Sequence, residues 1–295
     1  MSPLELISFV LIAIQIITES LPISSSAHVS IALLLFGKAN YIFDASTVYP
    51  PFLDDFLHGP ASLITLIFFR KRWWFLVKQL FVSSLILAKN NFHRNSLRDT
   101  QRQSFLLCIR LITLFCISSC GFLLFYAIIN HEKKMFLTDN NQIIILFFGL
   151  LITTALLLSQ RWIKHDTYKS LTRDKALILG LTQGCAMFLP GLSRLGSTLI
   201  VGMWLGLSPR RSFEWSMIMI FPYTAAAFLI RGLPAIISQA HNWLSPAHII
   251  LFLGATIISY ACFAWCYRLA QRHTLWALGI YMIIPLTILV LHFLG

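Results

Sequence analysis

The chain alternates between long apolar runs and short polar segments that are mostly basic. A helix needs about 20 predominantly apolar residues to cross a bilayer, so runs near that length predict transmembrane helices. Another run, residues 73–88, begins with two tryptophans and carries Lys78, which predicts a helix in the membrane interface. Six transmembrane spans are predicted, at residues 53–69, 104–129, 142–160, 213–231, 248–270 and 275–294.

Two pairs of shorter runs have a polar break between their members. Residues 3–18 and 22–37 flank Pro22. Each covers about 24 Å as a helix, less than the roughly 30 Å hydrocarbon core. Pro22 cannot donate to a helical ladder, so the pair favours a re-entrant helix hairpin over one broken spanning helix. The runs 176–189 and 195–207, interrupted at Pro190-Gly191, form a second such pair.

The order of elements is the same in both halves: one hairpin, then three spans. Gln15 and Gln183 each lie seven residues before the proline of their break, a local echo of the same order. A half with an odd number of crossings must be inverted relative to its copy. We therefore predict an all-α polytopic membrane protein with one domain, 1–295, made of two inverted-topology repeats, about 1–160 and about 175–295.

The distribution of basic residues predicts the orientation in the membrane. The chain is 57% hydrophobic and 12% charged, with a net charge of +12. Of its Lys and Arg residues, 17 fall in four loops of one predicted face, at 70–103, 161–175, 208–212 and 268–274. The positive-inside rule makes that face cytoplasmic and explains the charge without nucleic acid. Both termini then lie outside, and the two hairpins enter from opposite faces.

Two smaller features carry little chemistry. All six cysteines fall in apolar helical sequence, and two pairs have i,i+4 spacing without a histidine or acidic partner. This pattern favours packing over metal binding and implies no disulfide framework. The N-terminus lacks the basic region of a signal peptide, so we expect it to belong to the mature protein.

Arg194 is the strongest candidate for function in the second break. Its planar guanidinium matches a phosphate and stays charged when desolvated, although an internal ion pair with Glu19 or Glu214 would also explain it. Ser193 precedes a helix start there, and the amides of the following turn, Gly196-Ser197-Thr198, predict an anion-binding concavity.

The first break combines a carboxylate, three hydroxyls and an imidazole. Glu19 could bind a divalent cation, act as a base, orient His28, or cap the following turn. His28 is the only histidine of this hairpin and is a candidate general acid or base. The three hydroxyls bond the local backbone or supply a nucleophile and phosphate donors, and they belong to Ser24, Ser25 and Ser26.

For the other ionisable residues the sequence leaves two possible roles open. Glu214 either pairs with Arg210 and Arg211 at the surface or supports the site. Asp54, Asp55 and His58, at the outer start of the span 53–69, either line the mouth of the site or form an interfacial polar cluster, which we favour.

At these residues the sequence resembles the bacitracin-resistance (BacA-type) undecaprenyl-diphosphatase family. That family carries a Glu-Gly-x-Thr-Glu-Phe-Leu-Pro-x-Ser-Ser-x-Gly-His motif and a Pro-Gly-x-Ser-Arg-Ser-Gly motif. The first corresponds here to Gln15-Ile16-Ile17-Thr18-Glu19-Ser20-Leu21-Pro22-Ile23-Ser24-Ser25-Ser26-Ala27-His28. The second corresponds to Pro190-Gly191-Leu192-Ser193-Arg194-Leu195-Gly196.

The resemblance implies a site made of Glu19, Ser25, His28, Ser193 and Arg194, an inverted-repeat fold, and a divalent cation, Mg²⁺ or Ca²⁺. Glu19 would be a ligand of that cation. Three positions depart from the family pattern: Gln15 replaces a glutamate, Ala27 a glycine and Leu195 a serine. The loss of a carboxylate at Gln15 predicts an altered metal demand, with Glu19 paired to Arg194 or His28 instead.

The implied reaction is hydrolysis of undecaprenyl diphosphate to undecaprenyl phosphate and phosphate, which recycles the cell-wall lipid carrier. The implied location is the bacterial cytoplasmic membrane, with the active site open to the outer face and membrane lipids around it. Arg194, the Gly196 and Ser197 amides and the serines would hold the phosphates. Ser25, or a water molecule, would attack, and His28 with Glu19 would move the proton. The alternative is a polyprenyl-phosphate flippase or an anion transporter on the same fold.

Overall fold

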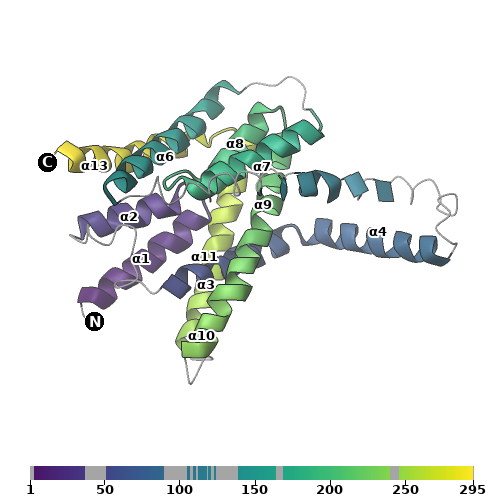
Figure 1. The fold of residues 1–295 in the computed structure, drawn as a ribbon, viewed down its shortest axis with the longest axis horizontal. Helices are drawn as coiled ribbons and strands as arrows, with labels where there is room; N and C mark the ends of the chain where they lie inside the picture. The colour runs from purple at the N-terminus through teal and green to yellow at the C-terminus, as the bar shows by residue number, and fades with distance from the viewer. Residues whose placement is uncertain are drawn as a thin grey trace.

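The computed structural model describes residues 3–36, 51–89, 139–163, 169–239 and 246–294, together with part of 105–123. Every regular element in these segments is a helix (Figure 1). Three of the helices are long and apolar enough to cross a membrane, at Ile143–Trp162, Pro209–Ile237 and Ile249–Gln271. The described part of the chain is therefore all-helical with several apolar helices, as expected of a polytopic membrane protein.

Three predicted spans are confirmed as long apolar helices. They are α6 (Asp139–Ser159) with its 3₁₀ continuation η4 (Gln160–Trp162), α9 (Pro209–Ala226), and α11 (Pro246–Gln271). Helix α3 (Pro51–Phe68) covers the predicted span 53–69. Helix α4 (Arg70–Lys89) covers the predicted interfacial helix and extends away from the main bundle (Figure 1). The predicted span 104–129 lies largely outside the described residues.

The last predicted span, 275–294, is present as an apolar helical segment, Trp276–His292, that is interrupted at one residue. It is divided into α12 (Trp276–Tyr281) and α13 (Ile283–Leu294), which meet at Met282. Pro285 explains the division, because a proline lacks the N–H that would bond the carbonyl of Tyr281 four residues earlier, and its ring crowds that carbonyl.

Both predicted hairpins are present as pairs of short helices. Helices α1 (Pro3–Glu19) and α2 (Ser25–Leu35) flank Pro22, and α7 (Arg173–Phe188) and α8 (Arg194–Trp204) flank Pro190. The second helix of each pair has 11 residues and begins after an extended serine N-cap, with φ/ψ of −75°/114° at Ser24 and −73°/119° at Ser193. Eleven residues reach only about 16 Å, so neither helix crosses a membrane alone.

The second break packs directly against α6. Gly191 has a φ of +89°, and a Cβ there would lie 2.3 Å from the carbonyl oxygen of Leu146. A Cβ on Gly149 of α6 would lie 2.1 Å from the carbonyl oxygen of Pro190. The Thr153 hydroxyl donates to the Gly191 carbonyl at 2.9 Å and accepts from the Ser193 amide at 2.9 Å. Two glycines and one threonine thus fix the break in place.

The two breaks are in contact with each other. The amide of Gly191 donates to the Ser26 hydroxyl at 3.2 Å, and a Cβ on Gly196 would lie 2.6 Å from the Pro22 carbonyl oxygen. Leu21 and Ile23 of the first break share one buried apolar cluster with Leu195 and other α8 residues. Figure 1 shows the purple α1–α2 pair and the green α7–α8 pair converging at the centre of the bundle.

Helix α3 is held against the end of α9. There the chain forms a π-helical segment, η5 (Ala227–Gly232), followed by α10 (Leu233–Gln239). A Cβ on Gly232 would lie 2.6 Å from the backbone nitrogen of Phe56, so the two backbones touch. Arg231 also pairs with Asp55 at 2.8 Å. This packing fixes the rotation of α3 and with it the face that carries Asp54 and His58.

Candidate functional site

A cavity of about 560 Å³ opens where the two breaks meet. Its polar lining comes from both hairpins and from α3 and α9, and its apolar lining includes Leu21, Met217 and Phe263. A concave site with few convergent polar groups is the usual form of a ligand-binding site. The chemically versatile lining residues are Gln15, Glu19, Ser24, Ser25, Ser26, Asp54, His58, Ser193, Arg194 and Tyr223.

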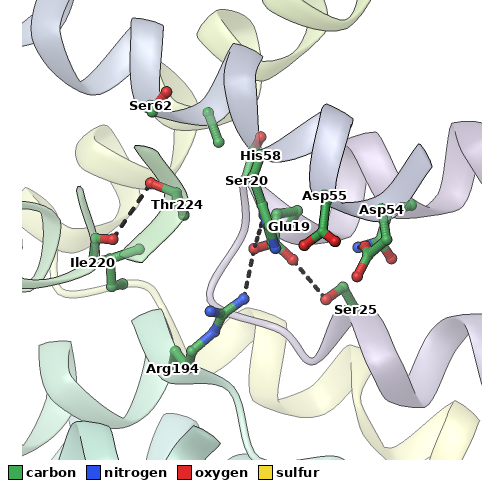
Figure 2. Close-up of polar contacts among 12 residues, drawn as sticks. Glu19, Ser20, Ser25, Asp54, Asp55, His58, Ser62, Arg194, Ile220 and Thr224 are labelled. Atoms are coloured by element: carbon green, nitrogen blue, oxygen red, sulfur yellow. Dashed lines mark hydrogen bonds and ion pairs between the residues drawn. The ribbon is translucent and has the colours of Figure 1, made fainter. Parts of the chain in front are cut away.

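The Glu19 carboxylate, at the end of α1, is the centre of the polar contacts (Figure 2). Its Oε1 accepts from the Arg194 guanidinium at 2.9 Å, and its Oε2 accepts from the Ser25 hydroxyl at 2.7 Å. The side chain of Glu19 is 12% exposed and that of Arg194 is 20% exposed. A buried charge needs a partner, and the two breaks supply one to each other. The internal ion pair foreseen for Arg194 is therefore present, and its guanidinium lines the cavity as well.

The three serines of the first break have different partners. The Ser24 hydroxyl caps α2 by accepting from the Ala27 amide at 3.3 Å and lies 3.0 Å from the Ser26 hydroxyl. Ser26 accepts from the Gly191 amide of the other break. Ser25 alone of the three bonds an ionised group, the Glu19 carboxylate. A carboxylate that accepts a hydrogen bond from a hydroxyl can act as its general base, which is how enzymes activate a serine nucleophile.

The amides of the second break are not directed at the cavity. The Gly196 amide donates to the Ser193 hydroxyl at 3.1 Å, which is the N-cap of α8, and the Ser197 amide donates to the Ser193 carbonyl at 2.9 Å. The Ser197 side chain is buried, and its hydroxyl donates to the Arg194 carbonyl at 3.2 Å. These amides, which we assigned to phosphate, are therefore used within α8 and its cap. Of the four residues, Ser193 and Arg194 line the cavity.

His28 does not reach the Glu19 carboxylate. Its Nδ1 lies 2.6 Å from the Ser24 carbonyl, its Nε2 lies 3.1 Å from the Tyr281 hydroxyl, and its ring stacks on Tyr281. The residue is also absent from the cavity lining. The role that we assigned to it in moving a proton together with Glu19 needs a contact that the structure does not provide.

The cavity histidine is His58 of α3, which we predicted to belong to an interfacial polar cluster. Its side chain is 4% exposed, and its Nδ1 lies 3.4 Å from Glu19 Oε1. Asp54, one helical turn earlier, accepts a hydrogen bond from the Gln15 amide. The interfacial reading of this cluster was wrong for these two residues, because both line the cavity. Their i,i+4 spacing, which puts both on one helix face, was the available signal.

Tyr223 of α9 is a second residue that the sequence did not reveal. The Arg194 guanidinium lies over its ring, 4.6 Å from the centroid, which is a cation–π contact. The same ring meets His58 edge-on, with centroids 5.8 Å apart. Tyr223 therefore contacts both nitrogen-bearing side chains around Glu19.

The donor set around Glu19 does not fit the divalent cation that the resemblance implies. Both Glu19 oxygens already accept hydrogen bonds, and the second carboxylate, Asp54, accepts from the neutral Gln15 amide. Within the described segments there is no group of three His, Cys, Asp or Glu side chains arranged for a metal ion. Hard cations bind through several charged oxygens, and here a guanidinium occupies that place.

Glu214 lies outside the cavity lining. It pairs with Arg210 one helical turn earlier, with 3.1 Å between Nε and Oε1. The predicted pairing with Arg210 is therefore present, but only the Arg210 side chain is at the surface, because that of Glu214 is 6% exposed. Since Glu214 does not line the cavity, we assign it no part in the site.

The chain is similar to one family and to several named proteins. A family model described as "Bacitracin resistance protein BacA" matches residues 8–288. "Undecaprenyl-diphosphatase 2" of Halalkalibacterium halodurans is 29% identical over 278 residues, covering 87% of this chain and 90% of the relative. "Undecaprenyl-diphosphatase" of Methanobrevibacter smithii is 26% identical over 286 residues, covering 94% of this chain and 96% of the relative.

Proposed function

The chain belongs to the bacitracin resistance protein BacA family, and on that premise we propose that it hydrolyses undecaprenyl diphosphate to undecaprenyl phosphate and phosphate. The two relatives described above are named for that activity, and the alignments cover 90% and 96% of their lengths. The enzyme is thus a membrane phosphatase acting on a phosphoric anhydride.

The observation that carries this function is the contact between Ser25 and Glu19 beside Arg194. The Ser25 oxygen attacks the terminal phosphorus, its proton passes to Glu19 Oε2, and the bond to the leaving undecaprenyl phosphate breaks. Glu19 passes this proton to the oxygen of the departing undecaprenyl phosphate and is a carboxylate again. Water then attacks the phosphoserine, Glu19 takes a proton from that water and returns it to the Ser25 oxygen as its bond to phosphorus breaks, and phosphate leaves. Arg194 offsets the negative charge on the phosphoryl oxygens.

The substrate suits the lining of the cavity. Polar residues gather around Glu19, whereas the apolar lining includes Leu189, Met217 and Ile220. The diphosphate fits the polar part, and the first part of the polyprenyl tail fits the apolar part, with the rest of the tail in lipid.

Phosphate release from C55 diphosphate by the purified protein in detergent tests this function. We expect release by the wild type, its loss in Ser25→Ala, and its retention in Ser84→Ala, whose hydroxyl is exposed on α4. Transfer of the lipid across vesicles without phosphate release would instead support the carrier reading. A carrier function would not explain why the Ser25 hydroxyl bonds the Glu19 carboxylate.

We also propose that the two halves of the chain are inverted repeats within one membrane domain, each a re-entrant hairpin followed by three spans. The matching serine caps and equal lengths of α2 and α8 support this, as do the internal prolines of the following helices, Pro60 in α3 and Pro222 in α9. In this arrangement the site opens to the outer face of the bacterial cytoplasmic membrane.

Cysteine labelling should place residue 170 in the cytoplasm. In a cysteine-free background, Ser170→Cys lies in an exposed part of the basic loop 161–175 and is expected to resist an impermeant thiol reagent in intact cells. Ser2→Cys, near the predicted outer N-terminus, should react without permeabilisation. Reaction of position 170 in intact cells would contradict the proposed orientation.

We propose that this enzyme works with little divalent cation because Arg194 balances Glu19. Gln15→Glu would add a third carboxylate, beside Asp54 and near Glu19, which favours a hard cation. The variant should therefore bind Mn²⁺, measured by electron paramagnetic resonance, and reach half-maximal phosphate release at lower Mg²⁺ than the wild type. Gln15→Met, which adds no charge, should gain neither property. Equal Mg²⁺ dependence in Gln15→Glu and wild type would show that position 15 does not contact the cation.

A further inference from the structure

His58 presents a buried nitrogen with no hydrogen-bond partner to the centre of the site. The residue is 3% exposed, and its Nδ1 has no hydrogen-bond partner among the atoms that the structure describes. A buried polar atom left without a partner costs free energy, so its retention calls for a reason. An acceptor, Glu19 Oε1, lies 3.4 Å away, close to but longer than a normal hydrogen bond.

Glu19 Oε1 is the same oxygen that Arg194 occupies. Arg194 donates to it at 2.9 Å, so His58 and Arg194 approach one oxygen from two helices, α3 and α8. Oε2 remains with Ser25. Figure 2 shows His58 and Arg194 on different sides of Glu19, with Ser25 reached by the second oxygen.

His58 is held firmly in this position. A Cβ on the adjacent Gly59 would lie 2.6 Å from the ring of Phe228, so α3 packs here without a gap. The ring of Tyr223 meets His58 edge-on and also lies under Arg194. The ionisable groups that act on His58 are Glu19 of α1, Asp54 of α3 and Arg194 of α8.

We propose that His58 is a positioning residue that takes over Glu19 Oε1 when the diphosphate draws Arg194 away. The proposal rests on the proposed phosphatase function. A diphosphate competes with Glu19 for the guanidinium, and a carboxylate left without a cationic partner would be costly in this buried site. A small shift then allows the Nδ1–H of His58 to donate to Oε1, and Oε2 stays aligned with the Ser25 hydroxyl.

Paired variants of nearly equal shape test the proposal. In His58→Asn an amide can donate from about the position of Nδ1, whereas His58→Leu fills a similar volume without a donor. We expect kcat of His58→Leu to fall about 10- to 100-fold with KM little changed, because a misaligned base slows chemistry while Arg194 still binds substrate. His58→Asn should recover most of that loss. Equal kcat in both variants, or a loss confined to KM, would overturn the proposal.

A second measurement does not depend on turnover. In wild-type protein labelled with ¹⁵N-histidine, the Nδ1 signal of His58 is assigned by its absence in His58→Asn. Methylenediphosphonate, a diphosphate that phosphatases do not cleave, should shift this signal toward that of a hydrogen-bonded N–H, but not in Glu19→Ala, which removes the acceptor oxygen. Binding of the probe without any shift would overturn the role of His58. This measurement needs no turnover. A wild type that releases no phosphate would therefore contradict the proposed function, whereas a missing shift would contradict the role of His58.

Discussion

Arg194→Lys should lower kcat/KM for phosphate release by about 10²-fold or more, the effect of removing one preorganised donor from a charge-stabilising site. The guanidinium now donates to Glu19 at 2.9 Å while its face lies over the Tyr223 ring. A planar fork can hold a carboxylate or phosphate through two parallel bonds and stack at the same time, whereas an ammonium cannot. Because lysine keeps the positive charge, a fall in kcat/KM would be due to the loss of the planar shape of the guanidinium.

The fold should survive this change. Residue 194 is the first of α8, and the cap of that helix depends on the Ser193 hydroxyl and the Gly196 amide, which the substitution leaves in place. Thermal unfolding in detergent would verify this. Arg211→Lys is the matched control, because Arg211 is exposed and lies outside the cavity. Turnover near that of the control would mean that the guanidinium is structural.

The sequence was sufficient to predict the two hairpins and the position of the break in each. Pro22 and Pro190 interrupt apolar runs too short to cross a bilayer, and both interruptions appear where expected. The pairing of Glu19 with Arg194 could also be foreseen, because buried charges of opposite sign in adjacent breaks stabilise each other.

The use of the Gly196 amide was predictable but was missed. A serine before a helix takes the amide three residues later, so Ser193 leaves the Gly196 donor unavailable. The division of the last helix at Met282 had a similar local signal in Pro285. In both cases a capping or proline rule, applied to the sequence, would have given the observed structure.

The roles of His58 and Tyr223 could not be read from local sequence. Which histidine faces Glu19 depends on the rotation of α3, and that rotation is set by the close contact of Gly232 with Phe56, far away in the chain. His28 is nearer in sequence, but its ring bonds the Ser24 carbonyl within its own helix. Periodicity predicts which helix a residue lies in, whereas tertiary packing decides what its side chain meets.

Glu19→Gln should lower kcat by about 10²- to 10⁴-fold, which is the usual contribution of a general base. The amide keeps the size of the side chain and can still accept one hydrogen bond, but it cannot take the proton of Ser25. Phosphate release in detergent would measure the loss. Glu214→Gln is the matched control, since that carboxylate pairs with Arg210 outside the cavity, and it should retain activity.

The double variant Glu19→Gln/Ser25→Ala distinguishes two roles for Glu19: general base for Ser25, or charged partner of Arg194. If Glu19 acts by accepting the Ser25 proton across the 2.7 Å contact, the two residues form one unit, and the double variant should be no slower than Ser25→Ala alone. If Glu19 only orients Arg194, the two losses should multiply, because they would then act on different parts of the reaction. Multiplying losses would remove Glu19 from the proton transfer and leave it as the partner of Arg194 at Oε1.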